Sequence, residues 1–343
     1  MNPRTSRRKL TSAAVSIAAV AALALSACGG SSTGAPAGSN SPNVKLSLVA
    51  YSVPQAAYAK LIAAFQKTSA GKNIQFTQSY GASGDQSRAV AAGLKADVVN
   101  FALASDVTRL VKAGLVDASW TAGPTKGIVT DSVVVIGTRK GNPKGIKTWD
   151  DLTKPGVQVI TPNPFTSGGA RWNILAGYAA KSNGGQDDAA GMDYLSKLFS
   201  NVPVQDDSAR KALQTFAGGK GDAVLDYEDD VLFAQKNGQS IDYTVPDPNI
   251  LIENPIAVTK DSAHPAEAKA FVDFLLSPAA QKIWADNGFR PVVQVAGTNF
   301  PQPSKLYTIA DLGGWDSATT KFFDPEKGAL VSIEQKKGVA VKK

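Results

Sequence analysis

The sequence has few of the residues on which metal and redox chemistry depend. Its 343 residues include one cysteine, Cys28, and one histidine, His264. A lone cysteine forms no disulfide within the chain, and protein metal sites need several clustered His, Cys or carboxylate ligands. A Ser-His-Asp relay would have only His264 as its base, and this residue precedes Pro265 at a predicted helix start, where capping or surface exposure is the simpler interpretation. We therefore expect no metal, no cofactor and no enzymatic activity.

Long hydrophobic runs are also missing. The apolar run Ala13–Leu25 is too short to span a membrane, and it follows four cations, without an acid, in the first nine residues. This is the pattern of an export signal, used by the Sec or the twin-arginine route. The letters LSA before Cys28 resemble the lipobox of bacterial lipoproteins, which implies cleavage there and a lipid on the cysteine sulfur. We expect residues 1–27 to be a signal peptide and the protein to lie outside the cytoplasm, anchored to a membrane.

Large apolar residues are absent from the segment after Cys28, which is rich in Gly, Ser, Pro and Ala. Such a composition predicts a flexible tether over residues 28–43. Loss of the four leader cations would reduce the formal net charge from +7 to +3. Because no Lys/Arg cluster is interleaved with aromatic residues, we expect no nucleic-acid partner.

From Val44 onward, short apolar runs alternate with patterns of helical period. This order predicts an α/β fold with mainly parallel sheets and helices on both faces, in which ligands bind where strands lead into helices. Predicted strands are 44–51, 96–102, 132–138, 157–161, 222–227 and 255–259; predicted helices lie around 58–65, 107–115, 170–180 and 190–199 and after Pro265 and Pro278.

Three predicted turns combine small residues with a following helix: Tyr80–Ser87 (YGASGDQS), Phe165–Trp172 (FTSGGARW) and Gln205–Ala212 (QDDSARKA). The first N–H groups of a helix have no partner inside it and carry partial positive charge. Small side chains let an anion reach these groups directly. Each turn alone is also explained by ordinary capping, but the three together would form a cage of hydrogen-bond donors.

Other interpretations of these turns fail on spacing. A P-loop needs lysine and a hydroxyl residue after its second glycine, and TSGGARWN has neither; no turn carries GxGxxG. A GxSxG nucleophile elbow would need glycine where Asp85 stands. The acidic run Asp226–Asp230 (DYEDD) is most simply a solvated helix start.

Several blocks together resemble the sulfate-binding proteins of ATP-driven sulfate uptake systems, whose close relatives bind thiosulfate. These blocks are ADVVNFALASDV, RKGNPKGIKTWDDLTKPGVQVITPNPFTSGGARWN, DSAR, FRP and LGGW. The similarity extends from about Val44 to the segment DLGGWDSATTKFF. It implies a type II periplasmic-binding-protein fold, whose two lobes close over one anion and deliver it to an ABC permease. We expect a monomer.

The resemblance also implies a ligand site built mainly from backbone N–H groups. The SGG block supplies the Ser167 hydroxyl and the amides of Gly168 and Gly169, and the DSAR turn supplies the amide of Ala209. The turn that reads GGSG in relatives corresponds to GASG here and supplies the amide of Ser83.

Two positions differ from the pattern of relatives. Ser52, in YSV, replaces the aspartate of YDP; its amide can still bind, but a side-chain pairing with Arg210 cannot form. Tyr227, in YED, replaces the tryptophan of WEN, so a phenol, which can also accept a hydrogen bond, stands in for an indole donor. Arg210 is expected beside the ligand site rather than in it, with a surface helix position as the alternative.

By analogy with the two-lobed fold, residues 44–128 and 254–290 would form the first lobe and residues 129–253 the second. Residues 291–343 would supply C-terminal helices that pack across the lobes. The crossings are expected near Gly127–Asp131 and Ile252–Pro255.

The number of protons that an anion carries at neutral pH distinguishes the candidate ligands. Sulfate has no proton near neutral pH, whereas the P–OH of phosphate would need an acceptor in a dry pocket, and a buried donor without one costs roughly 1–3 kcal/mol. Tyr227 and Asp207 are the groups that could act as such acceptors. The sequence therefore favours a receptor for sulfate, with thiosulfate as a second ligand, over one for molybdate or phosphate. A secreted hydrolase acting on anionic esters is the alternative of another class.

Overall fold

The computed structural model describes residues 44–339 and 341, which form one compact unit. The predicted signal peptide, the tether and Cys28 lie outside the described residues. No helix in the described ranges is both long and apolar enough for a transmembrane span.

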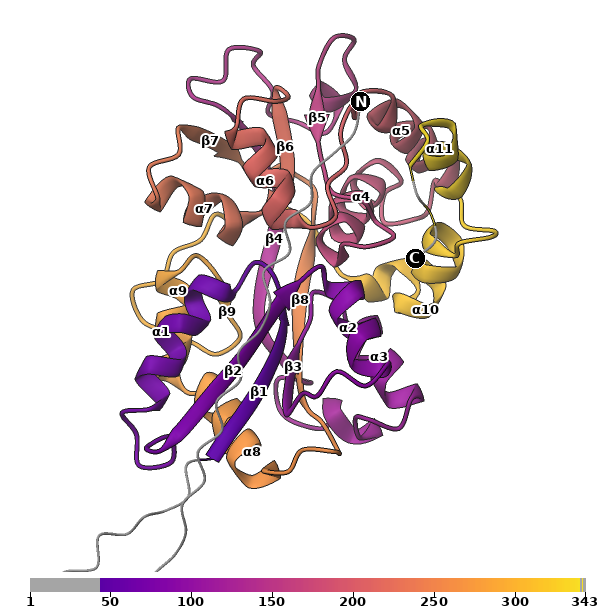
Figure 1. Ribbon diagram of the computed structural model, residues 1–343. Coiled ribbons are helices and arrows are strands. Elements are labelled where there is room, and N and C mark those ends of the chain that lie inside the picture. Colours follow the sequence, from indigo (N-terminus) through magenta and orange to yellow (C-terminus); the bar gives the residue numbers. More distant parts are fainter. Residues whose placement is uncertain (1–43, 340, 342–343) are drawn as a thin grey trace, which may run out of the picture. The chain divides into compact units, whose positions relative to one another are not determined.

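The first lobe contains the sheet strands β1 (Val44–Tyr51), β2 (Ile74–Gly81) and β3 (Val98–Asn100) (Figure 1). Strand β1 lies between β2 and β3 and is parallel to both. The helices of this lobe are α1 (Gln55–Phe65), α2 (Ser83–Ala91), α3 (Ala104–Lys112), α8 (Pro265–Leu275) and α9 (Pro278–Asp286).

The second lobe contains β5 (Val159–Ile160), β6 (Ala223–Tyr227) and β7 (Ile241–Thr244). Its helices are α4 (Gly168–Lys181), α5 (Asp188–Ser200), α6 (Ala209–Ala217) and α7 (Glu228–Lys236). Helix α4 directly follows a strand-to-helix turn, as the SGG block predicts.

Two long strands, β4 (Ile128–Arg139) and β8 (Asn249–Val258), belong to both lobes. They pair with each other in antiparallel orientation; the end of β8 then pairs with β3, and the end of β4 pairs with β6 and β7. Every one of these pairs is antiparallel, because β4 and β8 carry the chain between the lobes in opposite directions. The sheet is therefore mixed, and the prediction of mainly parallel sheets needs this correction.

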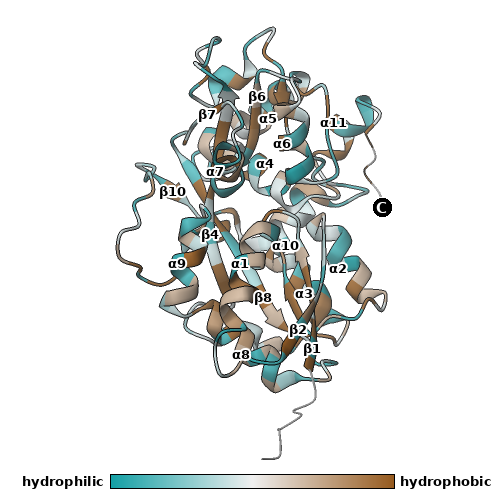
Figure 2. Cartoon of the chain, turned by 60° about the vertical axis from the view of Figure 1, so that its left-hand side comes forward, coloured by the Kyte–Doolittle hydropathy of each residue, from teal (hydrophilic) through white to brown (hydrophobic). Residues whose placement is uncertain are grey.

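Alternate residues of the central strands face opposite helical layers. In β1, Leu46, Leu48 and Ala50 belong to the apolar cluster that includes α1 and α8, whereas Val49 packs with Val90 of α2 and others. Both faces of the strand are thus buried, as expected for a sheet covered by helices. Figure 2 shows the resulting pattern, with strands mainly hydrophobic and teal segments on the outer helices.

The C-terminal segment contains β9 (Arg290–Pro291), β10 (Leu306–Tyr307), α10 (Gly314–Ala318), the π-helical turn η4 (Thr319–Phe323) and α11 (Val331–Lys336). Trp315 of α10 packs edge-on against Trp172 of α4, with ring centroids 4.7 Å apart. Lys321 pairs with Asp188 of α5 at 2.7 Å, so this segment covers the α4–α5 side of the second lobe.

Candidate anion site

A small cavity lies where turns of both lobes meet. Its empty volume is about 220 Å³. None of the described residues that line it carries a charged side chain. The lining consists of Tyr51, Ser52, Val53, Gly81, Ala82, Ser83, Ala102, Ser167, Gly168, Gly169, Ser208, Ala209 and Tyr227. All seven residues predicted to bind the ligand are therefore brought together around one cavity.

Ser167 is the N-cap of α4. Its hydroxyl oxygen accepts a hydrogen bond from the Ala170 N–H at 3.2 Å, and its own N–H donates to the Asn163 carbonyl at 2.8 Å. The cap thus uses the oxygen as an acceptor and leaves the hydroxyl proton available for a ligand in the cavity. The next residues, Gly168 and Gly169, occupy the first helical turn, where an N–H has no partner within the helix.

Close packing requires both glycines, Gly168 against the first lobe and Gly169 against α6 of its own lobe. A Cβ on Gly168 would lie 2.6 Å from Ala102 Cβ and 2.9 Å from Leu103 Cγ, both in the loop after β3. A Cβ on Gly169 would lie 3.1 Å from Ala209 Cβ. The absence of side chains therefore lets three turns approach one point.

The first-lobe turn is held by its own side chains. The Ser83 hydroxyl donates to Asp106 at 2.6 Å and accepts from the Ala102 N–H at 2.9 Å, so it is fully engaged. Only the backbone N–H of Ser83, at the first position of α2, is left to face a ligand. This agrees with the predicted role of its amide rather than its hydroxyl.

The third turn begins α6 and positions Ala209 and Arg210. Ser208 caps this helix, and Ala209 is its first residue. The Arg210 guanidinium lies 2.9 Å from the Asp230 carboxylate and donates from Nη2 to the Val53 carbonyl at 2.7 Å. Arg210 is thus only 18% exposed and ties the loop after β1 to the second lobe, which removes the surface alternative.

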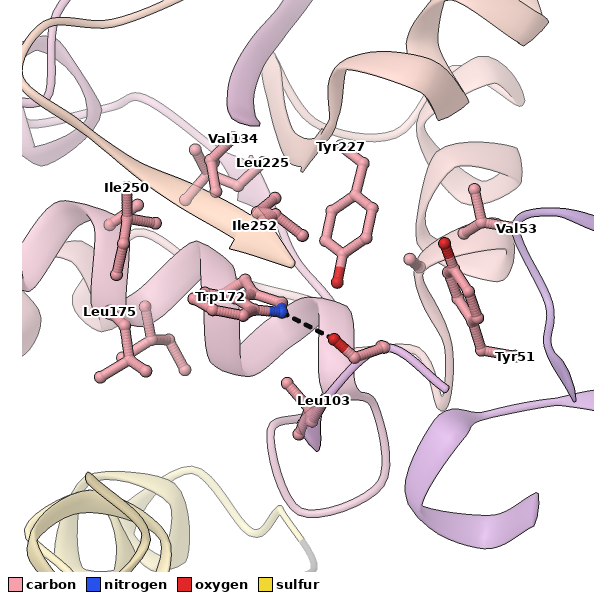
Figure 3. Packing of buried hydrophobic residues seen from close by; sticks show 14 of the residues in the cluster. Tyr51, Val53, Leu103, Val134, Trp172, Leu175, Leu225, Tyr227, Ile250 and Ile252 are labelled. Carbon is pink, nitrogen blue, oxygen red and sulfur yellow. Dashed lines mark hydrogen bonds between the residues drawn. The ribbon is translucent and has the colours of Figure 1, made fainter. Parts of the chain in front are cut away.

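Tyr227 and Tyr51 supply two phenols at this cavity (Figure 3). Both rings are buried, their centroids are 6.4 Å apart, and neither hydroxyl has a hydrogen-bond partner of good geometry among the described residues. Burial, followed by Asp229, raises the pKa of both phenols well above its usual value, and Asn254 opposes part of the rise for Tyr227. Both therefore remain protonated and can donate. Tyr51 was not predicted, although an aromatic residue at the end of the first strand, just before Ser52, is a signal that could have indicated it.

The acidic run after β6 is not solvated, contrary to the sequence interpretation. Asp226, Glu228, Asp229 and Asp230 are all at most 1% exposed. The last three each interact with a side chain that is distant in the sequence. Glu228 accepts a hydrogen bond from Arg290 at 2.7 Å, Asp229 accepts one from Ser132 at 2.6 Å, and Asp230 forms an ion pair with Arg210. The acids begin α7 but face inward, because the helix starts in the interior between β6 and the crossing strands.

Asp207, by contrast, is exposed and pairs with Lys211 at 2.5 Å, so it is not an acceptor in the cavity.

These buried acids predict a pH dependence of stability. Burial, opposed by the Ser132 hydrogen bond, raises the pKa of Asp229 to about 8 from its ordinary 3.8, and burial raises the pKa of Asp230 to about 6. A folded-state pKa above the unfolded one means that folding binds protons, so the stabilisation is complete below about pH 4 and disappears as pH rises toward 8. We expect the free energy of unfolding, measured with urea, to fall across this window.

Asp229→Asn should flatten that fall and raise stability at pH 8, while leaving stability at pH 4 close to that of the parent. The matched control is Asp273→Asn, which removes an exposed carboxylate paired with Lys269 on α8. An unchanged pH slope in Asp229→Asn would show that this carboxyl does not titrate in the folded state.

Three hydrogen bonds connect the lobes around the cavity. Trp172 Nε1 donates to the Ala102 carbonyl at 2.8 Å (Figure 3), and the Gly84 N–H donates to the Thr166 carbonyl at 3.3 Å. The third is the bond from Arg210 to Val53. Since each joins a helix of one lobe to a loop of the other, the structure is in a closed arrangement. No group of three or more potential ligands suited to a metal occurs in the described ranges.

Comparison with known proteins identifies the family to which this architecture belongs. Residues 46–290 match the model of a family described as bacterial extracellular solute-binding protein. The chain belongs to this family of extracellular solute-binding proteins. A solved structure, the sulfate-binding protein SubI from Mycobacterium tuberculosis H37Rv, is 46% identical, with a TM-score of 0.80 over 82% of this chain and 100% of that chain.

Relatives of this solute-binding protein carry names that agree with the sequence resemblance, which is thereby confirmed. A sulfate-binding protein of Synechococcus elongatus is 42% identical over 93% of this chain and 94% of its own length. A thiosulfate-binding protein of Pseudomonas aeruginosa is 35% identical over 80% of this chain and 88% of its own length. A periplasmic thiamin binding protein, 18% identical with a TM-score of 0.64, shares the fold alone.

Proposed function

We propose that this protein is an extracytoplasmic receptor that encloses one sulfate, or thiosulfate, between its lobes and delivers it to an ABC permease. The observation that carries this proposal is the cavity itself, whose lining has no charged side chain among the described residues and which is surrounded by three helix starts. The proposed donors are the amides of Ser52, Ser83, Gly168, Gly169 and Ala209 and the hydroxyls of Ser167 and Tyr227. Helix N-termini and polarised peptides would balance the charge without a cation in contact.

The donor set favours a fully deprotonated anion. Every proposed amide only donates, and Asp207 faces solvent instead of the cavity. The protonated Tyr227 phenol donates as well, and its oxygen is the one group among these donors that could also accept from a P–OH group. Because the other donors cannot accept that proton, we place phosphate below sulfate. The relatives named for sulfate and thiosulfate support the same order.

Calorimetric titration of residues 28–343 with sulfate, thiosulfate, molybdate and phosphate tests the proposal. We expect saturable heat with sulfate at micromolar concentration, and phosphate binding at least about 10-fold weaker, the equivalent of one unmet buried donor of roughly 1.4 kcal/mol. Absence of sulfate binding, or tighter binding of molybdate or phosphate, would reassign the ligand.

Ser167→Ala, compared with a control variant, separates the proposed bond from the Ser167 hydroxyl to the anion from the role of this hydroxyl as a helix cap. A hydrogen bond to a charged group contributes roughly 1.5–3 kcal/mol, so we expect sulfate binding about 10- to 100-fold weaker. Ser277→Ala is the matched control, since Ser277 caps α9 through the Ala280 N–H but is not part of the cavity. Equal loss of affinity in both variants would mean that only cap stability matters.

We propose that β4 and β8 contain the hinge, at the crossings near 127–131 and 252–255. The antiparallel pairing of these segments and the absence of another described strand shared by both lobes support this position. An anion that contacts both lobes would favour the closed form by its differential affinity.

We further propose that Cys28 carries a lipid that anchors the protein to the membrane. The support is the LSAC sequence after a basic, apolar leader. In cells that express the full chain, Cys28→Ala should move the protein from the membrane fraction to the soluble fraction. Unchanged partition would contradict lipidation at this residue.

A further inference from the structure

An exposed leucine lies at one end of the first lobe. Leu94 is 41% exposed and belongs to the loop between α2 and β3. Among the described residues, Leu306 is the only other exposed large hydrophobic residue. The five residues 91–95 are all exposed, so this loop projects into solvent and leaves Leu94 uncovered. One exposed leucine is ordinary on a protein surface, so its surroundings decide whether it has a role.

Four exposed lysines lie at the same end of the lobe. Lys45 and Lys95 line one surface cavity together with Leu94. The segment that holds Lys67 and Lys72 leads directly into β2, whose first residue pairs with the first residue of β1 (Figure 1). None of the four lysines forms an ion pair with any described residue. We call these four lysines and Leu94 the lysine patch.

Carboxylates at this end of the lobe compensate little of the charge. Asp97 lines the same cavity, but it is buried and accepts a hydrogen bond from the Ser47 N–H at 2.6 Å. Asp117 and Asp261 are exposed, but they lie near Lys260, on the β8 side of this end. The lysine patch therefore keeps an excess of positive charge.

The second lobe differs in this respect. Most of its lysines form ion pairs with nearby carboxylates, among them Lys140 with Asp242, Lys144 with Asp222, Lys154 with Asp151, Lys181 with Asp150 and Lys197 with Asp193. Each of these pairs satisfies its own charge. The lysine patch, by contrast, is free to attract an anionic partner.

The position of the lysine patch in the chain indicates which partner this is. The described chain begins at Val44, the first residue of β1 and the neighbour of Lys45. The fifteen residues 29–43 separate Cys28 from Val44. A chain of this length reaches at most about 50 Å when fully extended. A lipid on Cys28, as proposed above, would therefore keep the lysine patch close to a membrane surface.

We propose that the lysine patch docks on an anionic lipid surface, with Leu94 inserted among the lipids. Lysines beside a membrane are attracted to anionic headgroups, and an apolar side chain adds affinity when it leaves water. A soluble acidic partner would satisfy the lysines alone, whereas a lipid surface also offers an apolar layer to Leu94. Docking would orient the first lobe toward the membrane in which the permease lies.

Vesicle flotation tests this proposal without the lipid anchor. Residues 28–343 with Cys28→Ala are mixed with vesicles of phosphatidylglycerol and phosphatidylcholine in equal amounts, or of phosphatidylcholine alone. We expect binding to the anionic vesicles at about 50 mM salt, loss of binding at about 0.5 M salt through screening, and no binding to phosphatidylcholine. The orientation rests on the proposed lipid on Cys28, but this measurement does not. Cell fractionation of Cys28→Ala tests the lipid separately.

Paired variants locate the contact. Lys45→Gln/Lys95→Gln should weaken binding to the anionic vesicles about 25-fold, since each lysine near such a surface contributes a factor of about five. The matched control is Lys147→Gln/Lys220→Gln, which removes two exposed lysines of the second lobe and should change binding less than about twofold. Equal losses in the two double variants would mean that only net charge matters, and would overturn the proposal.

Insertion of Leu94 is measured separately from charge attraction. Cys28 is the only cysteine, so Cys28→Ala/Leu94→Cys can be labelled at one position with an environment-sensitive fluorophore. Its emission should shift to the blue on anionic vesicles. The label in Cys28→Ala/Leu306→Cys should not shift, because β10 pairs with the end of β8 that is opposite to β3. Equal binding to phosphatidylcholine vesicles, or no shift at position 94, would overturn the proposal.

Discussion

Gly168→Ala is expected to weaken sulfate binding roughly 100-fold, one of the two largest effects that the structure predicts. The added methyl would lie 2.6 Å from Ala102 Cβ and 2.9 Å from Leu103 Cγ, closer than non-bonded carbons approach. Overpacking of this kind typically costs about 1–3 kcal/mol. Because the contact crosses from α4 to the first lobe, that cost applies to the closed form and not to the open one. The loss should therefore appear in affinity, with little change in the urea midpoint of the ligand-free protein.

Gly123→Ala provides the control for Gly168→Ala. An added Cβ at Gly123 meets no atom within 4 Å, and this residue lies on the surface of the first lobe. Small-angle X-ray scattering should show contraction on sulfate addition for the parent and for Gly123→Ala, but not for Gly168→Ala. Normal affinity in Gly168→Ala would contradict the view that glycine is needed here for close approach of the lobes.

Sequence reasoning reached the helix starts of the site because their signals are local. The SGG block combines a capping serine with two residues that lack side chains, and this combination can be recognised without tertiary contacts. The strand 44–51 was likewise predicted with its observed bounds, since apolar residues, turn residues and the following helical period all agree. Helices α2 and α6 begin at Ser83 and Ala209, each inside one of the three predicted turns, although the roles of these two residues were implied by the family resemblance and not by a local pattern.

The remaining features depend on partners far along the chain. The local sequence around Asp230 and Glu228 is that of surface acids. Only the fold brings Arg210 within 2.9 Å of Asp230 and Arg290 within 2.7 Å of Glu228. Strand β8 was predicted only from residue 255 because its first half carries polar residues, among them Asn249. Asn249 is buried through hydrogen bonds to the backbone of Val134 on β4, which no local pattern reveals.

Arg210→Met is expected to lower the free energy of unfolding by about 3 kcal/mol, since removal of one partner of a buried pair leaves the other uncompensated. Asp230 is fully buried, and Arg210 is the group that lowers its pKa against burial. Without the arginine, Asp230 should take up a proton near neutral pH. The destabilisation should therefore increase with pH, as urea unfolding at pH 5 and pH 8 would show.

The double variant Arg210→Met/Asp230→Asn separates stability from closure. Replacing the carboxylate by a neutral amide removes the uncompensated charge, so the double variant should recover most of the lost stability. It cannot restore the hydrogen bond from Arg210 to the Val53 carbonyl, which joins the lobes at 2.7 Å. Sulfate affinity should thus remain about 10-fold or more below that of the parent, because a charged donor contributes roughly 1.5–3 kcal/mol. If affinity recovers together with stability, Arg210 acts only through the fold of the second lobe; if stability alone recovers, its bond to Val53 contributes to holding the lobes together over the anion.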